Sequence, residues 1–224
     1  MSFASGLVCL PANVTATGAV IDAAAQCGAR LVYVSTDYVF DGLKDSPYTE
    51  TDATGPVNFY GETKLAGERL VAKSSVPWLI VRVSTLFGPG RSTFVESVIR
   101  RAEAGESATV FVDQTTSPTY AVDAAEGLMR LIDVRATGVV HVVNAGAASR
   151  VDVATAALTL WGLPRTALRV VRMADARLPA RRPPNSSLAV NRLQQWTGWS
   201  PPTWQTALAQ HLTWLKHSTI SSNA

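Results

Sequence analysis

The chain has 224 residues, 47% hydrophobic and 17% charged, so it can bury a core large enough for one or two domains. A formal net charge of +3, with arginines scattered along the chain, argues against a nucleic-acid-binding protein. Two cysteines exclude a disulfide framework, and three histidines without metal-ligand spacing indicate no metal site.

No apolar run is long enough to span a membrane, and the first 12 residues lack the basic start of a signal peptide. We therefore expect a protein of the reducing cytoplasm that does not bind membranes.

Hydrophobic periodicity predicts helices that alternate with strands. The expected helices cover residues 15–26, 58–72, 93–104, 120–132, 151–161 and 204–216. The expected strands cover residues 31–35, 78–84, 109–112 and 139–143, with an extended segment at 168–172. Residues 43–56 read as a long loop, and long loops in compact domains are usually functional.

This alternation favours the α/β class, with a Rossmann-like parallel sheet, helices on both of its faces and a small C-terminal lobe. We expect a partial dinucleotide-binding domain over residues 1–145, a substrate-binding lobe over 146–217 and a frayed tail over 218–224.

Polar side chains gather where two expected strands end. Ser35 and Thr36 close the first strand, and Ser84 closes the second. Parallel sheets bind ligands at this carboxyl end. Tyr60 and Lys64 are four residues apart on a helix, so both reach one side of it. An ammonium beside a phenol lowers its pKa from about 10, which suits proton donation to a ketone that accepts a nicotinamide hydride. The plainer interpretation is a pair on a helix surface.

Four strings in the chain support the first interpretation. STDYVFDG, PYTETDATGPVNFYGETKLAGE, DQTTSPTY and RRPPNSSL, in this order, resemble the dTDP-4-dehydrorhamnose reductase family of extended short-chain dehydrogenases. The resemblance runs from Asn13 to the last helix and implies that Thr36, Tyr60 and Lys64 are catalytic. Tyr60 then donates the proton to the C4 keto oxygen that Thr36 holds, and NADPH or NADH delivers the hydride. Lys64 binds the nicotinamide ribose and lowers the pKa of Tyr60.

The resemblance also assigns binding residues. On the cofactor side these are Tyr60, Lys64, Arg82 and Ser84, the last two in the strand-end loop beside the nicotinamide. On the side of the nucleotide sugar they are Tyr38, Val39, Phe40, Gln114, Pro118, Thr119, Arg182 and Asn185. Pro118 also fits a simple turn, and Arg182 a surface charge. Many family members have an aromatic residue where this chain has Thr85, which leaves the exact sugar open.

The Gly-x-Gly-x-x-Gly turn that binds a dinucleotide pyrophosphate does not occur in the chain. By resemblance, roughly two βα units of the family, on the order of 60 to 70 residues, have no counterpart here. We therefore expect weak cofactor binding and exposed sheet edges.

Three interpretations stay open. The chain is the truncated form of an active reductase, or a non-catalytic subunit like the regulatory subunits of methionine adenosyltransferase, or an epimerase or dehydratase that shares Tyr-x-x-x-Lys. The expected ligand is a small nucleotide sugar, and a homodimer is compatible with the sequence.

Overall fold

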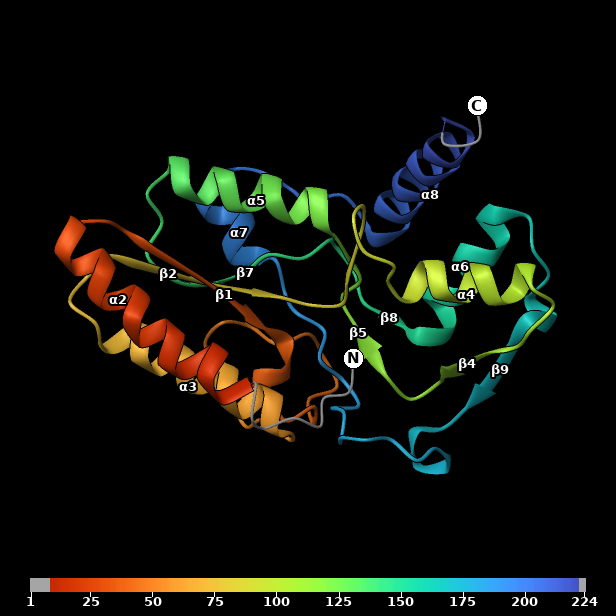
Figure 1. Cartoon of the computed structure of the whole chain (residues 1–224), viewed down its shortest axis with the longest axis horizontal. Coiled ribbons are helices and arrows are strands. Elements are labelled where there is room, and N and C mark those ends of the chain that lie inside the picture. Colours follow the sequence, from red (N-terminus) through yellow and green to blue (C-terminus); the bar gives the residue numbers. More distant parts are fainter. Residues whose placement is uncertain (1–8, 222–224) are drawn as a thin grey trace.

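A three-stranded parallel sheet forms the centre of the computed structural model, which describes residues 9–221. Its strands lie in the order β1-β2-β7. Helices α2 and α3 cover one face of the sheet, and α5 and α7 cover the other (Figure 1). The bounds are β1 Leu31–Thr36, β2 Trp78–Val83, β7 Gly138–His141, α2 Ala16–Cys27, α3 Phe59–Lys73, α5 Ala121–Asp133 and α7 Asn191–Thr197. This confirms the predicted Rossmann-like α/β class.

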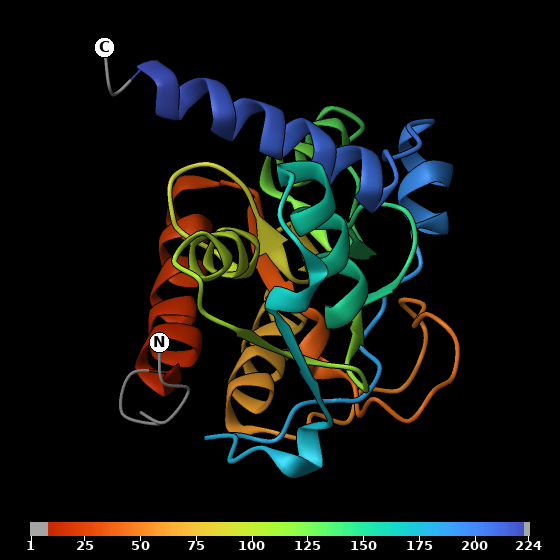
Figure 2. The same ribbon diagram turned by 90° about the vertical axis from the view of Figure 1, so that its right-hand side faces the viewer.

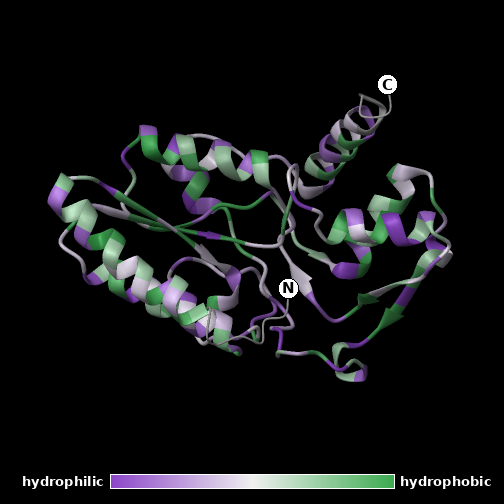
Figure 3. Ribbon diagram, viewed as in Figure 1, coloured by the Kyte–Doolittle hydropathy of each residue, from purple (hydrophilic) through white to green (hydrophobic). Residues whose placement is uncertain are grey.

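A second body packs beside the sheet around a parallel strand pair, β4 and β9. Figure 2 shows the long helix α8 passing over α6, and the two helices share a core with α4. The bounds are α4 Phe94–Glu103, β4 Ala108–Phe111, α6 Arg150–Trp161, β9 Leu168–Val171 and α8 Trp204–Ser221. Figure 3 shows both polar and apolar residues around α4, as expected for a helix that buries one face, and its Val95 and Ile99 pack into this core.

The expected boundary at residue 145 is wrong, because the two bodies exchange segments of chain. Helix α4 and strand β4 precede that boundary, yet Val98 and Val110 pack against Leu158 of α6. Helix α7 follows it, yet Leu193 packs against Leu79 of the central sheet. Periodicity predicts that a segment buries one face but does not say which core receives it.

The observed elements otherwise lie within a few residues of the expected ones. Helix α7 was not predicted, because seven residues are too few for a clear helical period. We expected a frayed tail from residue 218, but α8 continues to Ser221, and the remaining tail residues lie outside the described range. Residues 43–56 form a loop as predicted, and a β-bridge between Tyr48 and Leu188 is one of the contacts that join it to the C-terminal part.

Short elements complete the chain. They are the π-helical turn Pro11–Thr15, the 3-10 turns Asp37–Val39, Arg165–Ala167 and Met173–Asp175, and the strand pairs β3 Leu86–Phe87 with β6 Thr119–Tyr120 and β5 Thr115–Thr116 with β8 Ala148–Ser149. Within residues 9–221, no helix combines the length and apolar character that a membrane span needs.

The close approach of α3 to the turn after β1 depends on a glycine. Asn58 caps α3 by accepting a hydrogen bond from the Gly61 amide (2.9 Å). A Cβ on Gly61 would overlap the backbone oxygen of Tyr38 and lie 2.9 Å from the Pro56 side chain. The turn and the helix can therefore be this close only with glycine at position 61.

We expect Gly61→Ala to reduce the free energy of unfolding by about 1–3 kcal/mol, because the backbone of Tyr38 has to move. Gly18→Ala is the matched control, since a Cβ on Gly18 meets no atom within 4 Å in α2. It should stabilise the protein by about 0.5–1 kcal/mol. Urea unfolding measures both, and equal effects of the two substitutions would contradict the close contact.

Candidate active site

The carboxyl end of the sheet brings Thr36 and Tyr60 into contact. Thr36 is the last residue of β1, and its hydroxyl lies close enough to the Tyr60 phenol to lower the pKa of that phenol. The same hydroxyl donates to Asp37 Oδ1 (3.0 Å) and accepts from the Tyr38 amide (3.2 Å). The Tyr38 and Tyr60 rings meet edge to face with centroids 6.2 Å apart. The structure thus brings these two expected catalytic residues together.

Lys64 lies on the same helix but turns toward the backbone of β1. Its Nζ donates to the Val34 carbonyl (2.7 Å) and lies 4.0 Å from the centroid of the Tyr33 ring. Burial lowers the pKa of Lys64 to about 8. Burial raises the pKa of Tyr60, and the negative charge of Asp37 adds to the rise while the Thr36 hydrogen bond opposes it. The pKa of Tyr60 is thus raised on balance, and its expected lowering by Lys64 stays a prediction.

This position of Lys64 predicts a pH dependence of stability. Its pKa falls from 10.5 to about 8 on folding, so between these values the unfolded chain binds more protons. Stability contributed by this group therefore rises as the pH increases from 8 towards 10.5. We expect Lys64→Met to remove this rise when urea unfolding is compared at about pH 7 and pH 9.5. An unchanged rise in the variant would show that another group causes it.

Asp37 is the central hydrogen-bond acceptor of the site, a role that the sequence patterns did not predict. Its side chain is almost fully buried. Oδ2 accepts from Ser84 Oγ (2.8 Å) and from Ser186 Oγ (2.5 Å), in addition to the Thr36 bond on Oδ1. Burial raises the pKa of Asp37, and the three hydroxyl donors oppose the rise. One carboxyl group thus joins the ends of β1 and β2 to the C-terminal segment.

A second series of hydrogen-bonded side chains begins at Tyr38. Gln114 Nε2 donates to the Tyr38 hydroxyl (3.3 Å), and Arg182 Nη1 donates to Gln114 Oε1 (3.5 Å). Gln114 is fully buried, whereas Arg182 is partly exposed. Tyr38, Gln114 and Arg182, three of the expected sugar-binding residues, therefore lie in one row next to Tyr60. Arg150, which sequence reasoning missed, lies near the same row.

Val39 and Phe40 were expected to line the sugar pocket, and the structure places both side chains in the core. Both are 0% exposed and belong to a core cluster with Tyr48 and Leu65. The 3-10 turn after β1 directs Tyr38 toward the site and the two following side chains inward. Phe40 stacks on Tyr48 with centroids 4.2 Å apart.

Arg82 was expected in the strand-end loop beside the nicotinamide, and its observed position differs. It lies within β2 and forms a two-fold hydrogen-bonded ion pair with Glu68 of α3, through Nε (2.9 Å) and Nη2 (2.7 Å). Both side chains are about 5% exposed, so this guanidinium does not face the expected nicotinamide site.

Two further expected substrate residues hold the local backbone together. Thr119 is fully buried and donates to the Ser117 carbonyl (2.9 Å). Asn185 donates to the Lys44 carbonyl (2.6 Å) and so fastens the C-terminal segment to the loop at residues 43–56. Pro118 differs, because it lines a cavity of ≈ 360 Å³ together with Thr85.

Fold and site together define the class of the protein. A parallel sheet whose carboxyl end places a threonine beside a tyrosine, with a lysine one turn further along the same helix, is the arrangement of an extended short-chain dehydrogenase/reductase.

Comparison with known proteins then identifies the family. The RmlD substrate binding domain matches residues 9–217. The chain is 35% identical over 212 residues to dTDP-4-dehydrorhamnose reductase of Burkholderia thailandensis, covering 88% of this chain and 71% of that protein. It is 38% identical over 209 residues to the enzyme of the same name from Mycobacterium tuberculosis, covering 89% of this chain and 68% of that protein. The chain therefore belongs to the dTDP-4-dehydrorhamnose reductase family.

Solved structures agree. The dTDP-4-dehydrorhamnose reductase from Bacillus anthracis in complex with NADP superposes with a TM-score of 0.85 at 32% identity, over 90% of this chain and 71% of that one. A dTDP-glucose 4,6-dehydratase from the same organism, in complex with NAD, has a TM-score of 0.80 at 17% identity, which shows the shared fold.

Proposed function

We propose that this chain carries the sugar-binding and proton-donating part of an NAD(P)H-dependent reductase. The substrate is a dTDP-4-dehydro-6-deoxysugar, and the reaction converts dTDP-4-dehydrorhamnose to dTDP-rhamnose by reducing its C4 ketone. The observation that carries the proposal is the position of Tyr60 beside Thr36 at the carboxyl end of the sheet, where the Tyr60 ring contacts Tyr38 and the Tyr38 amide donates to the Thr36 hydroxyl. Membership of the reductase family supports it.

Tyr60 supplies the proton in this proposal. Its raised pKa keeps the phenol protonated at neutral pH, so the proton is available when negative charge develops on the keto oxygen. Thr36 positions that oxygen by hydrogen bonding, and Asp37 fixes the Thr36 hydroxyl. When bound, the nicotinamide supplies the hydride to C4. The ketone gains one hydride and one proton and becomes a secondary alcohol.

The residues present fit one end of the dinucleotide. Lys64 has three N–H donors, and one of them is hydrogen-bonded to the Val34 carbonyl. The other two can donate to the hydroxyls of the nicotinamide ribose. For the pyrophosphate, no Gly-x-Gly-x-x-Gly turn occurs in the chain. A second candidate function is a nucleotide-sugar-binding protein without turnover.

The stoichiometry of cofactor oxidation tests the proposal. The chain is incubated with dTDP-4-dehydrorhamnose and NADPH or NADH, as it stands and with the Gly-rich βα units of a relative joined before Met1. We expect the joined form to oxidise one cofactor per dTDP-rhamnose formed. Binding of the sugar without oxidation in either form would favour the non-catalytic function. A new sugar without net oxidation would indicate an epimerase or dehydratase instead.

A further inference from the structure

Arg150, the first residue of α6, is a partly buried cation that lacks a carboxylate partner. Its Nε is buried and has no hydrogen-bond partner within residues 9–221. The guanidinium lies over the Phe94 ring, 4.7 Å from its centroid. The described part of the chain places no carboxylate oxygen within 4.0 Å of it.

The contrast with Arg82 shows how unusual this is. Arg82 is more deeply buried than Arg150, but Glu68 neutralises it through two hydrogen bonds. The charged groups that influence Arg150 are Asp37 and Arg182. Asp37 already accepts three hydroxyl donors, and Arg182 has the same sign of charge. Because burying an unpaired charge is costly, the environment of Arg150 favours an incoming anion.

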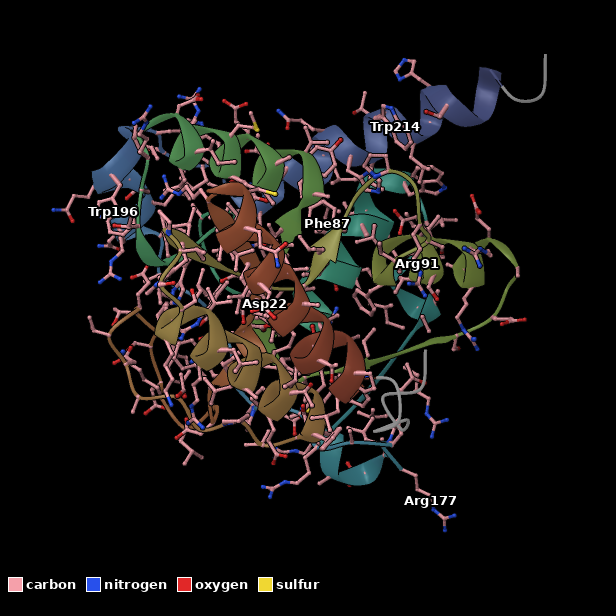
Figure 4. The ribbon with its side chains drawn as sticks, turned by 60° about the vertical axis from the view of Figure 1, so that its left-hand side comes forward. Asp22, Phe87, Arg91, Arg177, Trp196 and Trp214 are labelled. Atoms are coloured by element: carbon pink, nitrogen blue, oxygen red, sulfur yellow. The ribbon has the colours of Figure 1, made fainter. Side chains whose placement is uncertain are left out.

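Two cavities meet at this residue. One, of ≈ 360 Å³, is lined by Thr85, Pro118, Arg91 and Arg150 among others. The other, of ≈ 330 Å³, is lined by Phe94, Thr109, Val110, Phe111, Arg150 and Arg182. Figure 4 shows Phe87 at the end of β3 and Arg91 on the segment between β3 and α4, and both line the first cavity.

The first cavity is lined by Thr85, the residue that follows Ser84, and Ser84 donates to Asp37. The second cavity is lined by Arg182, at the end of the row that begins at Tyr38. Arg150 therefore lines both the cavity next to Ser84 in sequence and the cavity that holds a second guanidinium.

We propose that Arg150 is a specificity-determining residue that binds an anionic group of the substrate, a phosphate or a carboxylate, where these two cavities meet. The proposal rests on the proposed nucleotide-sugar site. The phosphate source is the nucleoside diphosphate, and the carboxylate source is an acidic sugar.

Thermal unfolding of the full chain tests this without cofactor or turnover. The probes, titrated at fixed ionic strength, are inorganic pyrophosphate, dTDP, UDP-glucose and UDP-glucuronate. We expect the anion to raise the midpoint temperature of the parent protein. Arg150→Gln should bind the effective probe about 10- to 100-fold more weakly, the loss expected for a charge-assisted hydrogen bond. Without ligand, this variant should be as stable as the parent or more stable, because an unpaired buried charge is gone.

Arg30→Gln is the matched control. Arg30 also has buried nitrogens without a hydrogen-bond partner, but it precedes β1 at the opposite, amino end of the sheet. This variant should keep the parental response to every probe.

The probes distinguish the two sources. A response to pyrophosphate and dTDP assigns Arg150 to phosphate, and a response to UDP-glucuronate beyond that to UDP-glucose assigns it to carboxylate. The inference is overturned if the parent responds to no probe, if Arg150→Gln responds like the parent, or if Arg30→Gln loses as much. An Arg150-dependent response in a protein without reductase activity would refute the proposed function alone. An active reductase whose KM is unchanged by Arg150→Gln would refute this inference alone.

Discussion

Tyr60→Phe should lower the rate of ketosugar reduction by about 100- to 10,000-fold, the range that a positioned general acid contributes. The loss should appear in kcat, because the phenol acts on the charge that develops during the reaction. The fold should persist, since a phenyl ring keeps the edge-to-face contact with Tyr38. The assay uses the chain joined to the Gly-rich βα units of a relative, so that a complete dinucleotide site is present.

Tyr48→Phe is the matched control for this experiment. The Tyr48 hydroxyl donates to Asp41 (2.5 Å), and its ring stacks on Phe40 outside the Thr36–Tyr60 contact. Removing that hydroxyl should cost about 1 kcal/mol of stability and leave kcat close to the parental value. A Tyr60→Phe variant as fast as the parent would refute proton donation by Tyr60.

Glu68→Ala should reduce the free energy of unfolding by about 3–5 kcal/mol, a large fraction of the stability of an ordinary domain. The substitution leaves the Arg82 guanidinium buried without its two acceptor oxygens. The cost arises mainly from this uncompensated charge and less from the lost attraction. Urea unfolding of the parent and the variant measures it.

Two further variants separate these contributions. The exposed pair of Glu126 and Arg130 lies four residues apart on α5, and Glu126→Ala should cost less than about 0.5 kcal/mol. The double variant Glu68→Leu with Arg82→Met should recover most of the lost stability, because it removes both charges. If Glu68→Ala were as mild as Glu126→Ala, the pair would not be buried in solution as the structure shows.

Local sequence patterns predicted that the residues of the candidate active site lie close together. A Ser-Thr pair at the end of an apolar run places a hydroxyl at the carboxyl end of a strand, and a four-residue spacing puts Tyr60 and Lys64 on one side of a helix. The structure brings Thr36 and Tyr60 together for these reasons. The four-residue spacing could not predict the direction of the Lys64 side chain, because the Val34 carbonyl that binds it belongs to another element.

The errors share one physical cause, the direction of side chains in a chain that folds back on itself. Val39 and Phe40 follow Tyr38 in the sequence, but the 3-10 turn sends them into the core. The partners Asp37 and Ser186 are 149 residues apart, and no periodicity links them. Long-range pairs of this kind also explain why the C-terminal segment belongs to the site while α7 belongs to the central sheet.

In the proposed reaction, Thr36 and Tyr60 act in the reduction of C4 of a nucleotide-linked ketosugar. The most direct measurement uses NADPH that carries deuterium at its transferable position, with the joined form of the chain and dTDP-4-dehydrorhamnose. We predict dTDP-rhamnose with one deuterium, bound to C4, and its near-complete loss in Tyr60→Phe. A product without deuterium, or with deuterium at another carbon, would contradict the assignment of Thr36 and Tyr60 to ketone reduction.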